Sequence, residues 1–339
     1  MQILGRASQV EKSVLTDSLG REHSYLRISL TDRCNLRCTY CMPQDGYPVL
    51  PSSEIMSYEE ILQLAYYFTS WGVNKIRLTG GEPLVRKDVV NLVERLSLMV
   101  PEVELGLTTN GVFLAPLAKK LKEAGLHKLN ISLDSLLPKR FAQITRRDEW
   151  QKVWDGILVA LEQDFSEIKI NVVLIRGVND DEILDFVELT RHMNLQVRFI
   201  EYMPFAQNEW EQNKIMSYQE ILELISQKYE FEPLNQNSAH IVAQTFQIEG
   251  FKGSFGVIAS MTETFCSDCN RIRLQADGGF KNCLFSPAQN NLKDALRAGA
   301  SEEDLAILVQ ESLWNKKIEH SDSAFLADEV GASMVGIGG

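Results

Sequence analysis

Six apolar stretches alternate with helical patterns between residues 24 and 204, and this rhythm restricts the fold more than any other feature of the sequence. The predicted strands are residues 24–31, 74–81, 102–111, 128–135, 168–176 and 196–204. Strands that alternate with helices form a parallel sheet with its helices packed against it. Six strands are fewer than the eight of a complete barrel, so we predict an α/β fold with an incomplete (βα)6 TIM-like barrel.

The predicted strands have one apolar and one polar face. In residues 24–31, Leu26 and Ile28 alternate with Arg27 and Ser29, and the next four strands follow the same pattern. Strands buried on both faces are usually apolar throughout. Helices should therefore cover the apolar face, and the polar face should line a ligand cavity inside the curved sheet, because buried polar groups need partners. The alternative is a solvated polar face with helices on one side only.

The rhythm changes after residue 204. A helix is predicted at 217–229, β-like runs at 240–249, 253–262 and 271–280, and helical sequence at 291–314. We therefore expect a barrel over residues 1–204, a C-terminal region over 205–330 packed on the sheet, and a mobile tail over 331–339 that ends in Gly338 and Gly339.

Charge and composition exclude several classes of partner. The formal net charge is −12, so the surface as a whole repels nucleic acid and membranes, and an anionic ligand needs a local basic pocket. The first 14 residues lack a signal-peptide core, and no apolar run is long enough to span a bilayer. We expect a cytoplasmic protein.

All six cysteines fall into two groups, 34/38/41 and 266/269/283. Disulfides are disfavoured in a reducing compartment. Thiolates suit zinc or iron–sulfur clusters, and a structural zinc needs four ligands. His23 and His240 could complete two zinc sites, whereas a cubane cluster held by three cysteines keeps one iron open. Because Cys34 follows the first strand at its carboxyl end, where barrel enzymes place their chemistry, a cluster is favoured.

The residues around the first cysteines resemble a known superfamily. CxxxCxxC with Tyr40 before the last cysteine, followed one unit later by GGEP at 80–83, is similar to the radical S-adenosylmethionine (SAM) superfamily. Further motifs resemble the GTP 3′,8-cyclase family of molybdenum cofactor biosynthesis, and the likeness extends from about residue 19 to residue 339. These motifs are TDRCNLRCTYCMP, IRLTGGEPLVR, LTTNG, LNISLDS, RFIEYMP, FCSDCNRIRL and the final Gly-Gly.

The resemblance implies two [4Fe-4S] clusters. Cys34, Cys38 and Cys41 would hold the first, whose open iron binds SAM; Cys266, Cys269 and Cys283 would hold the second, whose open iron binds the guanine of GTP. The positions that match SAM contacts are Tyr40, Gly81, Glu82, Ser132 and Met203. Those that match GTP contacts are Arg27, Arg77, Thr108, Lys169, Arg271 and Arg273. As an alternative, these basic residues could form interior salt bridges with Glu82, Asp134 or Glu201.

The family resemblance also implies a reaction. A 5′-deoxyadenosyl radical takes hydrogen from the ribose 3′ carbon of GTP, which then attacks guanine C8 to give 3′,8-cyclo-7,8-dihydro-GTP. Gly338 and Gly339 would enter the active site, where Arg27, Arg271 and Arg273 could meet the terminal carboxylate. Residues 237–244, NSAHIVAQ, depart from the family's Gly-Pro-Ala-like stretch, which leaves the contacts of that loop open.

Partners follow from the same likeness: an electron donor such as flavodoxin or ferredoxin, a second copy in a homodimer, and cyclic pyranopterin monophosphate synthase downstream. Two other functions remain open. One is a peptide-modifying radical SAM enzyme, although CNRIR and the terminal Gly-Gly favour GTP. The other is a zinc or iron–sulfur binding protein without catalytic activity.

Overall fold

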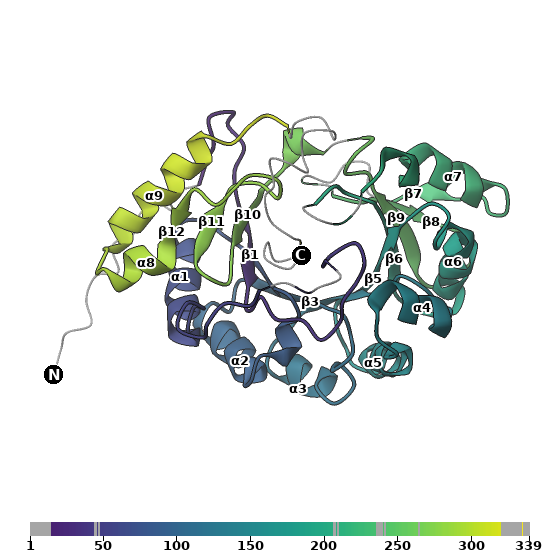
Figure 1. Cartoon of the computed structure of the whole chain (residues 1–339), viewed down its shortest axis with the longest axis horizontal. Coiled ribbons are helices and arrows are strands. Elements are labelled where there is room, and N and C mark those ends of the chain that lie inside the picture. The colour runs from purple at the N-terminus through teal and green to yellow at the C-terminus, as the bar shows by residue number, and fades with distance from the viewer. Residues whose placement is uncertain are drawn as a thin grey trace.

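A curved sheet forms the centre of the protein, with helices around its outer face (Figure 1). The computed structural model describes residues 15–43, 46, 48–205, 208, 210–234, 240, 242–263, 265–319 and 334. Within them the sheet has twelve strands in the order β12-β11-β10-β1-β2-β3-β4-β5-β6-β9-β8-β7. The predicted Gly338–Gly339 tail lies outside the described residues.

All six predicted strands of the barrel are present and parallel, which confirms the expected fold class. They are β1 (Tyr25–Ser29), β2 (Lys75–Thr79), β3 (Glu104–Thr109), β4 (Lys128–Ser132), β5 (Glu167–Leu174) and β6 (Gln196–Glu201). The helices between and after them are α1 (Tyr58–Ser70), α2 (Val89–Met99), α3 (Ala118–Glu123), α4 (Pro138–Thr145), α5 (Trp150–Leu161), α6 (Ile183–His192) and α7 (Tyr218–Ser226).

The C-terminal region extends the sheet at both edges rather than packing on it as expected. β9 (Ser254–Ile258) pairs in parallel with β6, and β10 (Arg271–Leu274) pairs in parallel with β1. Eight parallel strands therefore stand side by side, and the arc stays open between β9 and β10 (Figure 1).

Short antiparallel strands and two helices complete the C-terminal region. The strands are β7 (Glu232–Pro233), β8 (Gln244–Gln247), β11 (Gly279–Lys281) and β12 (Asn290–Asn291), and the helices are α8 (Leu292–Arg297) and α9 (Glu302–Trp314). β8 pairs with β9 and β11 with β10, so each outer edge of the parallel array ends in an antiparallel strand. Such strands cover edges that would otherwise present unpaired backbone groups.

The apolar faces of the strands form the main core, as predicted. Leu26, Ile28, Ile76 and Leu78 are completely buried against the helices. The first helix also begins and ends where the sequence predicts: Ser57 and Glu60 form a capping box at its start, and Gly72 follows its end with a φ of +100°. The polar faces are thereby turned to the inside of the arc.

None of the described helices is both long enough and apolar enough to cross a lipid bilayer.

Candidate active site

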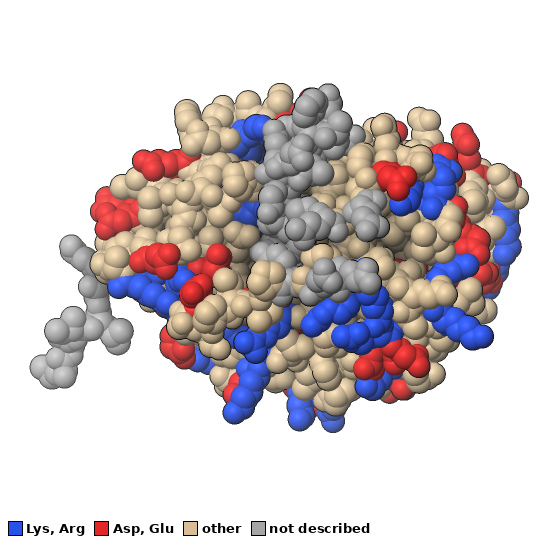
Figure 2. Space-filling model, viewed as in Figure 1, with Lys and Arg blue, Asp and Glu red and all other residues tan. Residues whose placement is uncertain are grey.

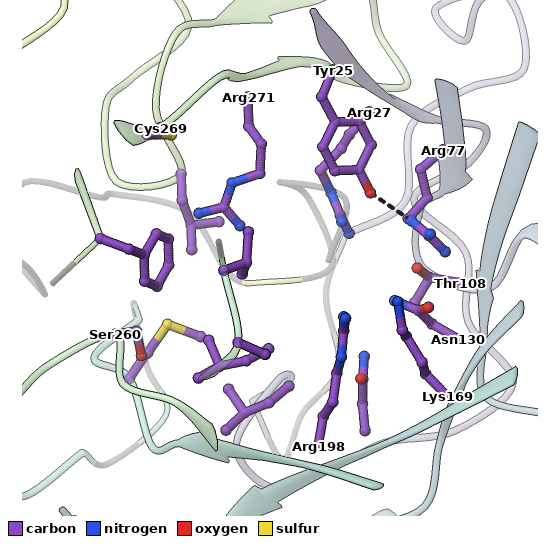
Figure 3. Close-up of a pocket in the computed structure, with 18 of the residues that line it drawn as sticks. Tyr25, Arg27, Arg77, Thr108, Asn130, Lys169, Arg198, Ser260, Cys269 and Arg271 are labelled. Carbon is purple, nitrogen blue, oxygen red and sulfur yellow. Dashed lines mark hydrogen bonds between the residues drawn. The ribbon is translucent and has the colours of Figure 1, made fainter. Parts of the chain in front are cut away.

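A cavity of about 620 Å³ occupies the concave side of the sheet (Figure 3). Basic side chains from five strands line it: Arg27, Lys75, Arg77, Lys169, Arg198, Arg271 and Arg273. Among the described residues that line the cavity, these seven bases face two acids, Asp134 and Glu167. In a chain with a net charge of −12, this is the local concentration of positive charge that an anionic ligand requires.

Strand register brings three of the arginines together. Arg27 on β1 stands beside Arg77 on β2 and Arg273 on β10. The Arg77 guanidinium is fixed on two sides, because Nε donates to the Tyr25 hydroxyl at 2.6 Å and Nη1 donates to the Leu107 carbonyl at 3.1 Å (Figure 3). These arginines are therefore placed before any ligand arrives.

Burial and mutual repulsion destabilise the protonated, positively charged forms of the bases in this cavity. Burial, with repulsion from neighbouring bases, lowers the pKa of Arg27 to about 10 and that of Lys169 to about 7. The pKa of Arg273 falls well below its ordinary value for the same reasons. Bound negative charge would relieve this repulsion, so the site favours a polyanion.

The alternative of interior salt bridges with Glu82, Asp134 or Glu201 is not what the structure shows. The Glu201 carboxylate accepts hydrogen bonds from the backbone N–H groups of Tyr218 and Met261, while Asp134 accepts from the Tyr40 hydroxyl and the Val173 N–H. The acid that does pair with a predicted substrate residue is Glu167, which contacts the ammonium of Lys169.

Neutral polar groups add a second requirement. Thr108 Oγ1, Asn130 Oδ1 and Asn171 Oδ1 are buried on the cavity wall without a hydrogen-bond partner among the described residues. Unsatisfied buried groups of this kind are rare in folded proteins and call for a ligand or water. A ligand with hydroxyl or amino groups as well as negative charge meets both requirements.

The first cysteine group lies on the loop after β1, against the end of α4. The backbone N–H groups of Arg37 and Thr39 donate to the Thr145 and Ile144 carbonyls at 2.9 Å each. Burial, followed by the charges of Asp134, Cys41 and Cys34, raises the pKa of the Cys38 thiol well above its usual value. Burial raises the pKa of the Cys34 thiol too, so thiolates in this group need nearby positive charge, which bound iron would supply.

The Gly80–Glu82 segment holds this loop in place. The N–H groups of Gly81 and Glu82 donate to the Thr31 and Arg33 carbonyls at 2.7 and 2.8 Å. A Cβ atom on Gly81 would stand 2.4 Å from the Arg33 carbonyl oxygen, so a glycine is required for this approach. The two glycines therefore shape the loop that carries Cys34.

Glu82 has a structural role in this arrangement. Its buried carboxylate accepts hydrogen bonds from the Leu84 N–H at 2.9 Å, the Thr109 hydroxyl at 2.7 Å and the Asn110 N–H at 2.6 Å. Burial raises its pKa to about 7. Gly81 and Glu82 do not line the cavity, whereas Tyr40, Ser132 and Met203 do, and the SAM contacts of all five stay predictions.

The second cysteine group borders the cavity directly. Cys266, Cys269 and Cys283 all belong to its wall, beside Arg271. Burial alone would raise the pKa of Cys269, but Arg271 and Lys316 lower it to about 6, with Lys316 Nζ 3.7 Å from the sulfur. A thiolate at this position is the form that binds iron.

The histidines do not complete the two groups in the way left open by the sequence. His23 lies 3.1 Å from Asp17 and 3.4 Å from Lys316, on the side of the second group rather than the first. His240 contacts Asp268. Among the residues that the structure describes, no group of three or more His, Cys, Asp or Glu side chains is placed to hold a single metal ion, so the choice between zinc and a cluster stays a prediction.

The structure thus gathers all six predicted GTP residues and the second three cysteines around one cavity. Sequence reasoning missed Tyr25, Lys75 and Arg198, which line the same space. Arg198 alternates with Val197 and Phe199 on β6, so it belongs to the polar face of that strand. The alternation that revealed the other bases could therefore have revealed Arg198 too.

Comparisons with known proteins agree with this geometry. Residues 28–190 match the Radical SAM superfamily, and residues 195–322 match Molybdenum Cofactor Synthesis C. The chain is 46% identical to "GTP 3′,8-cyclase, mitochondrial" of Arabidopsis thaliana, over 96% of its own length and 84% of that protein. It is 44% identical to "GTP 3′,8-cyclase" of Syntrophomonas wolfei, over 96% of its length and all of that protein.

Other relatives are longer. The mouse "Molybdenum cofactor biosynthesis protein 1" is 48% identical over the whole chain, but the match covers 53% of that protein. The chain thus spans about half the length of the animal relatives it matches. Among solved structures, Streptococcus suis SuiB bound to precursor peptide SuiA shares the fold with a TM-score of 0.59 at 14% identity, over 80% of this chain and 64% of that one.

Proposed function

Because the chain belongs to the GTP 3′,8-cyclase family of the radical SAM superfamily, we propose that it converts GTP to (8S)-3′,8-cyclo-7,8-dihydroguanosine 5′-triphosphate, the first step of molybdenum cofactor biosynthesis. One observation supports this assignment above the others. The cavity combines seven bases with three buried polar atoms that lack partners, which suits a triphosphate joined to a hydroxyl-bearing group.

Cys34, Cys38 and Cys41 would hold the first [4Fe-4S] cluster, and Cys266, Cys269 and Cys283 would hold the second. When bound, the first cluster and SAM supply a 5′-deoxyadenosyl radical, and the second cluster supplies an open iron for the guanine. The protein contributes orientation and exclusion of water.

Different residues of the cavity wall would contact SAM and the triphosphate of GTP. Tyr40, Ser132 and Met203 line it and would contact SAM, with Gly81 and Glu82 supporting the loop above. The triphosphate would lie among the bases, which are fixed by strand register before it binds. These bases are Arg27, Lys75, Arg77, Lys169, Arg198, Arg271 and Arg273.

Preorganised charge of this kind lowers the cost of holding a polyanion in one pose. The ribose would then lie near Thr108, Asn130 and Asn171, whose free oxygens accept hydrogen bonds. The diglycine tail, Gly338 and Gly339, belongs to the same proposal, with Arg27, Arg271 and Arg273 as partners for its carboxylate.

The deciding experiment is anaerobic incubation of the reduced, cluster-loaded protein with SAM and GTP. We expect 5′-deoxyadenosine and the cyclised nucleotide to form only when GTP is present. Equal deoxyadenosine without GTP, or turnover of a peptide instead, would favour the peptide-modifying alternative. Zinc without iron or sulfide in protein purified anaerobically would favour the binding protein.

Partners and location remain part of the proposal. A homodimer, an electron donor such as flavodoxin or ferredoxin, and delivery of the product to cyclic pyranopterin monophosphate synthase all follow from family membership. The Arabidopsis relative is mitochondrial by name, so the expected cytoplasmic location is a prediction for this chain alone.

A further inference from the structure

We propose that four arginines around the first cysteine loop form the docking surface for an acidic one-electron carrier protein, which reduces the first cluster from outside the barrel. The proposal rests on the proposed function, since it assumes a cluster on Cys34, Cys38 and Cys41. The four residues are Arg33, Arg37, Arg146 and Arg147, and we call them the cysteine-loop basic patch.

The fold brings the four arginines together from two distant segments. Arg33 and Arg37 lie on the cysteine loop, and Arg146 and Arg147 follow α4. The backbone bonds from residues 37 and 39 to residues 145 and 144 hold the two segments side by side. The Arg146 guanidinium also crosses between them, donating to the Met42 carbonyl at 3.2 Å and the Arg37 carbonyl at 3.4 Å.

No described acid neutralises the patch. Arg37 donates to the carbonyls of Cys34 and Leu36, and Arg147 donates to the carbonyl of Arg146. Among the described residues, the Arg33 guanidinium makes no hydrogen bond or ion pair, and both Arg33 and Arg147 are exposed. Figure 2 shows a group of Lys and Arg atoms between the positions of α3 and α4, with Asp and Glu atoms beside it. In a protein with a net charge of −12, an unpaired cluster of one sign marks a surface for a negative partner.

A hollow connects the patch with a cluster ligand. It measures about 360 Å³ and is lined by Asp32, Arg33, Cys34, Arg37, Met42 and Val49. Its acid, Asp32, is buried and accepts a hydrogen bond from the Leu50 N–H at 2.5 Å, and it faces two bases of the same lining, Arg33 and Arg37. Val49 is 53% exposed there and offers apolar contact area.

This hollow is separate from the substrate cavity. None of the four arginines lines the 620 Å³ cavity, and Cys34 lines the hollow but not the cavity. A partner on the patch could therefore reach the first cluster while GTP and SAM fill the barrel. In the step itself one electron passes from the reduced carrier, which is oxidised by one electron, to the cluster, which is reduced by one.

The test separates electron delivery from catalysis. The variant is Arg33→Glu/Arg147→Glu, and the matched control is Lys119→Glu/Lys252→Glu, which changes the net charge equally at exposed sites outside the patch. Deoxyadenosine formation with GTP is measured with a small reductant, dithionite, and separately with reduced flavodoxin as the acidic carrier. Binding of oxidised flavodoxin is measured directly by calorimetry.

We expect the patch variant to keep the wild-type rate with dithionite within about twofold. With flavodoxin below saturation, its rate and its binding should fall at least about tenfold, and their dependence on salt should weaken. The control should behave as wild type in every assay.

Three results would overturn the proposal. Equal losses with both reductants would make the arginines supports of the cysteine loop, and unchanged flavodoxin binding would place the carrier elsewhere. A shift of the variant's oligomeric state in sedimentation, with flavodoxin binding intact, would make the patch a contact between copies of this chain. Absence of GTP-dependent product from the wild type with dithionite would instead count against the proposed function.

Discussion

Gly106 controls the position of Arg77. A Cβ atom at residue 106 would stand 2.8 Å from Arg77 Cζ, and the guanidinium cannot move freely because it bonds to Tyr25 and the Leu107 carbonyl. We expect Gly106→Ala to weaken GTP binding about tenfold, or about 1.4 kcal/mol, while the fold persists. Binding to the cluster-loaded protein checks this.

A double-mutant cycle identifies the cause of the Gly106→Ala effect. If the alanine acts by displacing Arg77, then adding it to Arg77→Gln should cost little more. Fully additive losses would show that residue 106 acts in another way.

The pH dependence of GTP binding should report on Lys169. Burial lowers its pKa to about 7, and a bound triphosphate favours its charged form, so binding takes up a proton above pH 7. Tyr25 acts in the same direction: burial alone would raise its pKa, but Arg77, Arg27 and Lys75 lower it to about 7, and its anion repels phosphate. Affinity should therefore fall between pH 7 and 8.5, by at most about tenfold per pH unit for each proton taken up.

Lys169→Arg provides the control for this profile, because arginine stays charged throughout the range. We expect it to flatten the decline, and Tyr25→Phe to remove part of it. An affinity that holds steady or rises with pH in the wild type would contradict the assignment of Lys169 to the triphosphate.

At the residue scale, sequence showed where polar side chains point but not what each one contacts. The alternation of polar and apolar residues predicted that Arg27, Arg77 and Lys169 point into the cavity, because a strand sends alternate side chains to opposite faces. It could not reveal that the Glu82 carboxylate accepts hydrogen bonds from the Thr109 hydroxyl at the end of β3 and from the Asn110 N–H that follows, since those bonds join residues 27 and 28 positions apart.

The turn after β2 is the element that shapes the first metal site. We expect Gly81→Ala to push the Arg33 carbonyl away and distort the cysteine loop, because the new Cβ would lie 2.4 Å from that oxygen. Roughly half of the iron should be lost, since the second cysteine group is untouched and, on the proposed function, would keep its own cluster. Iron and sulfide analysis after anaerobic reconstitution measures the loss.

Gly46→Ala is the matched control, because a Cβ there meets no atom of the described residues within 4 Å, although its φ of +85° adds modest strain. Iron content should stay near wild type. Equal iron loss in both variants would mean that general instability, rather than the close approach at Gly81, empties the site.

At the element scale, the six barrel strands were predictable and the two flanking ones were not. β1 to β6 follow one another with helices between them, so local rhythm determines their order. β10 pairs with β1 across about 245 residues, and no local pattern encodes such a partner. For the same reason, the sequence indicated a C-terminal region packed on the sheet rather than one that continues it.

At the scale of the whole molecule, we expect residues 1–204 to need β9 and β10 in order to stay folded and soluble. A fragment of residues 1–204, the first domain in our sequence-based division, would leave β1 and β6 without β10 and β9 and expose two strand edges. We expect it to aggregate, as unpaired edges do. Light scattering and sedimentation of the fragment beside the full chain test this, and a soluble, folded monomer would show that 1–204 is independent.

The distribution of charge is also a property of the whole molecule. A net charge of −12 coexists with two concentrations of positive charge, one inside the arc and one on the cysteine loop. The surface repels anions in general while two places attract them, which on our proposals would separate the route of GTP from that of the electron carrier.

The late position of β9 and β10 has a consequence for biosynthesis. The residues before Ser254 must leave the ribosome before β9 can form, and β10 follows later still. During that interval the nascent chain already presents Cys34, Cys38 and Cys41, whereas the thiols of the opposite wall have not been made. Iron and sulfide delivered at that stage would meet a half-built barrel, so we expect cluster assembly to follow the pairing of β9 and β10 with the sheet.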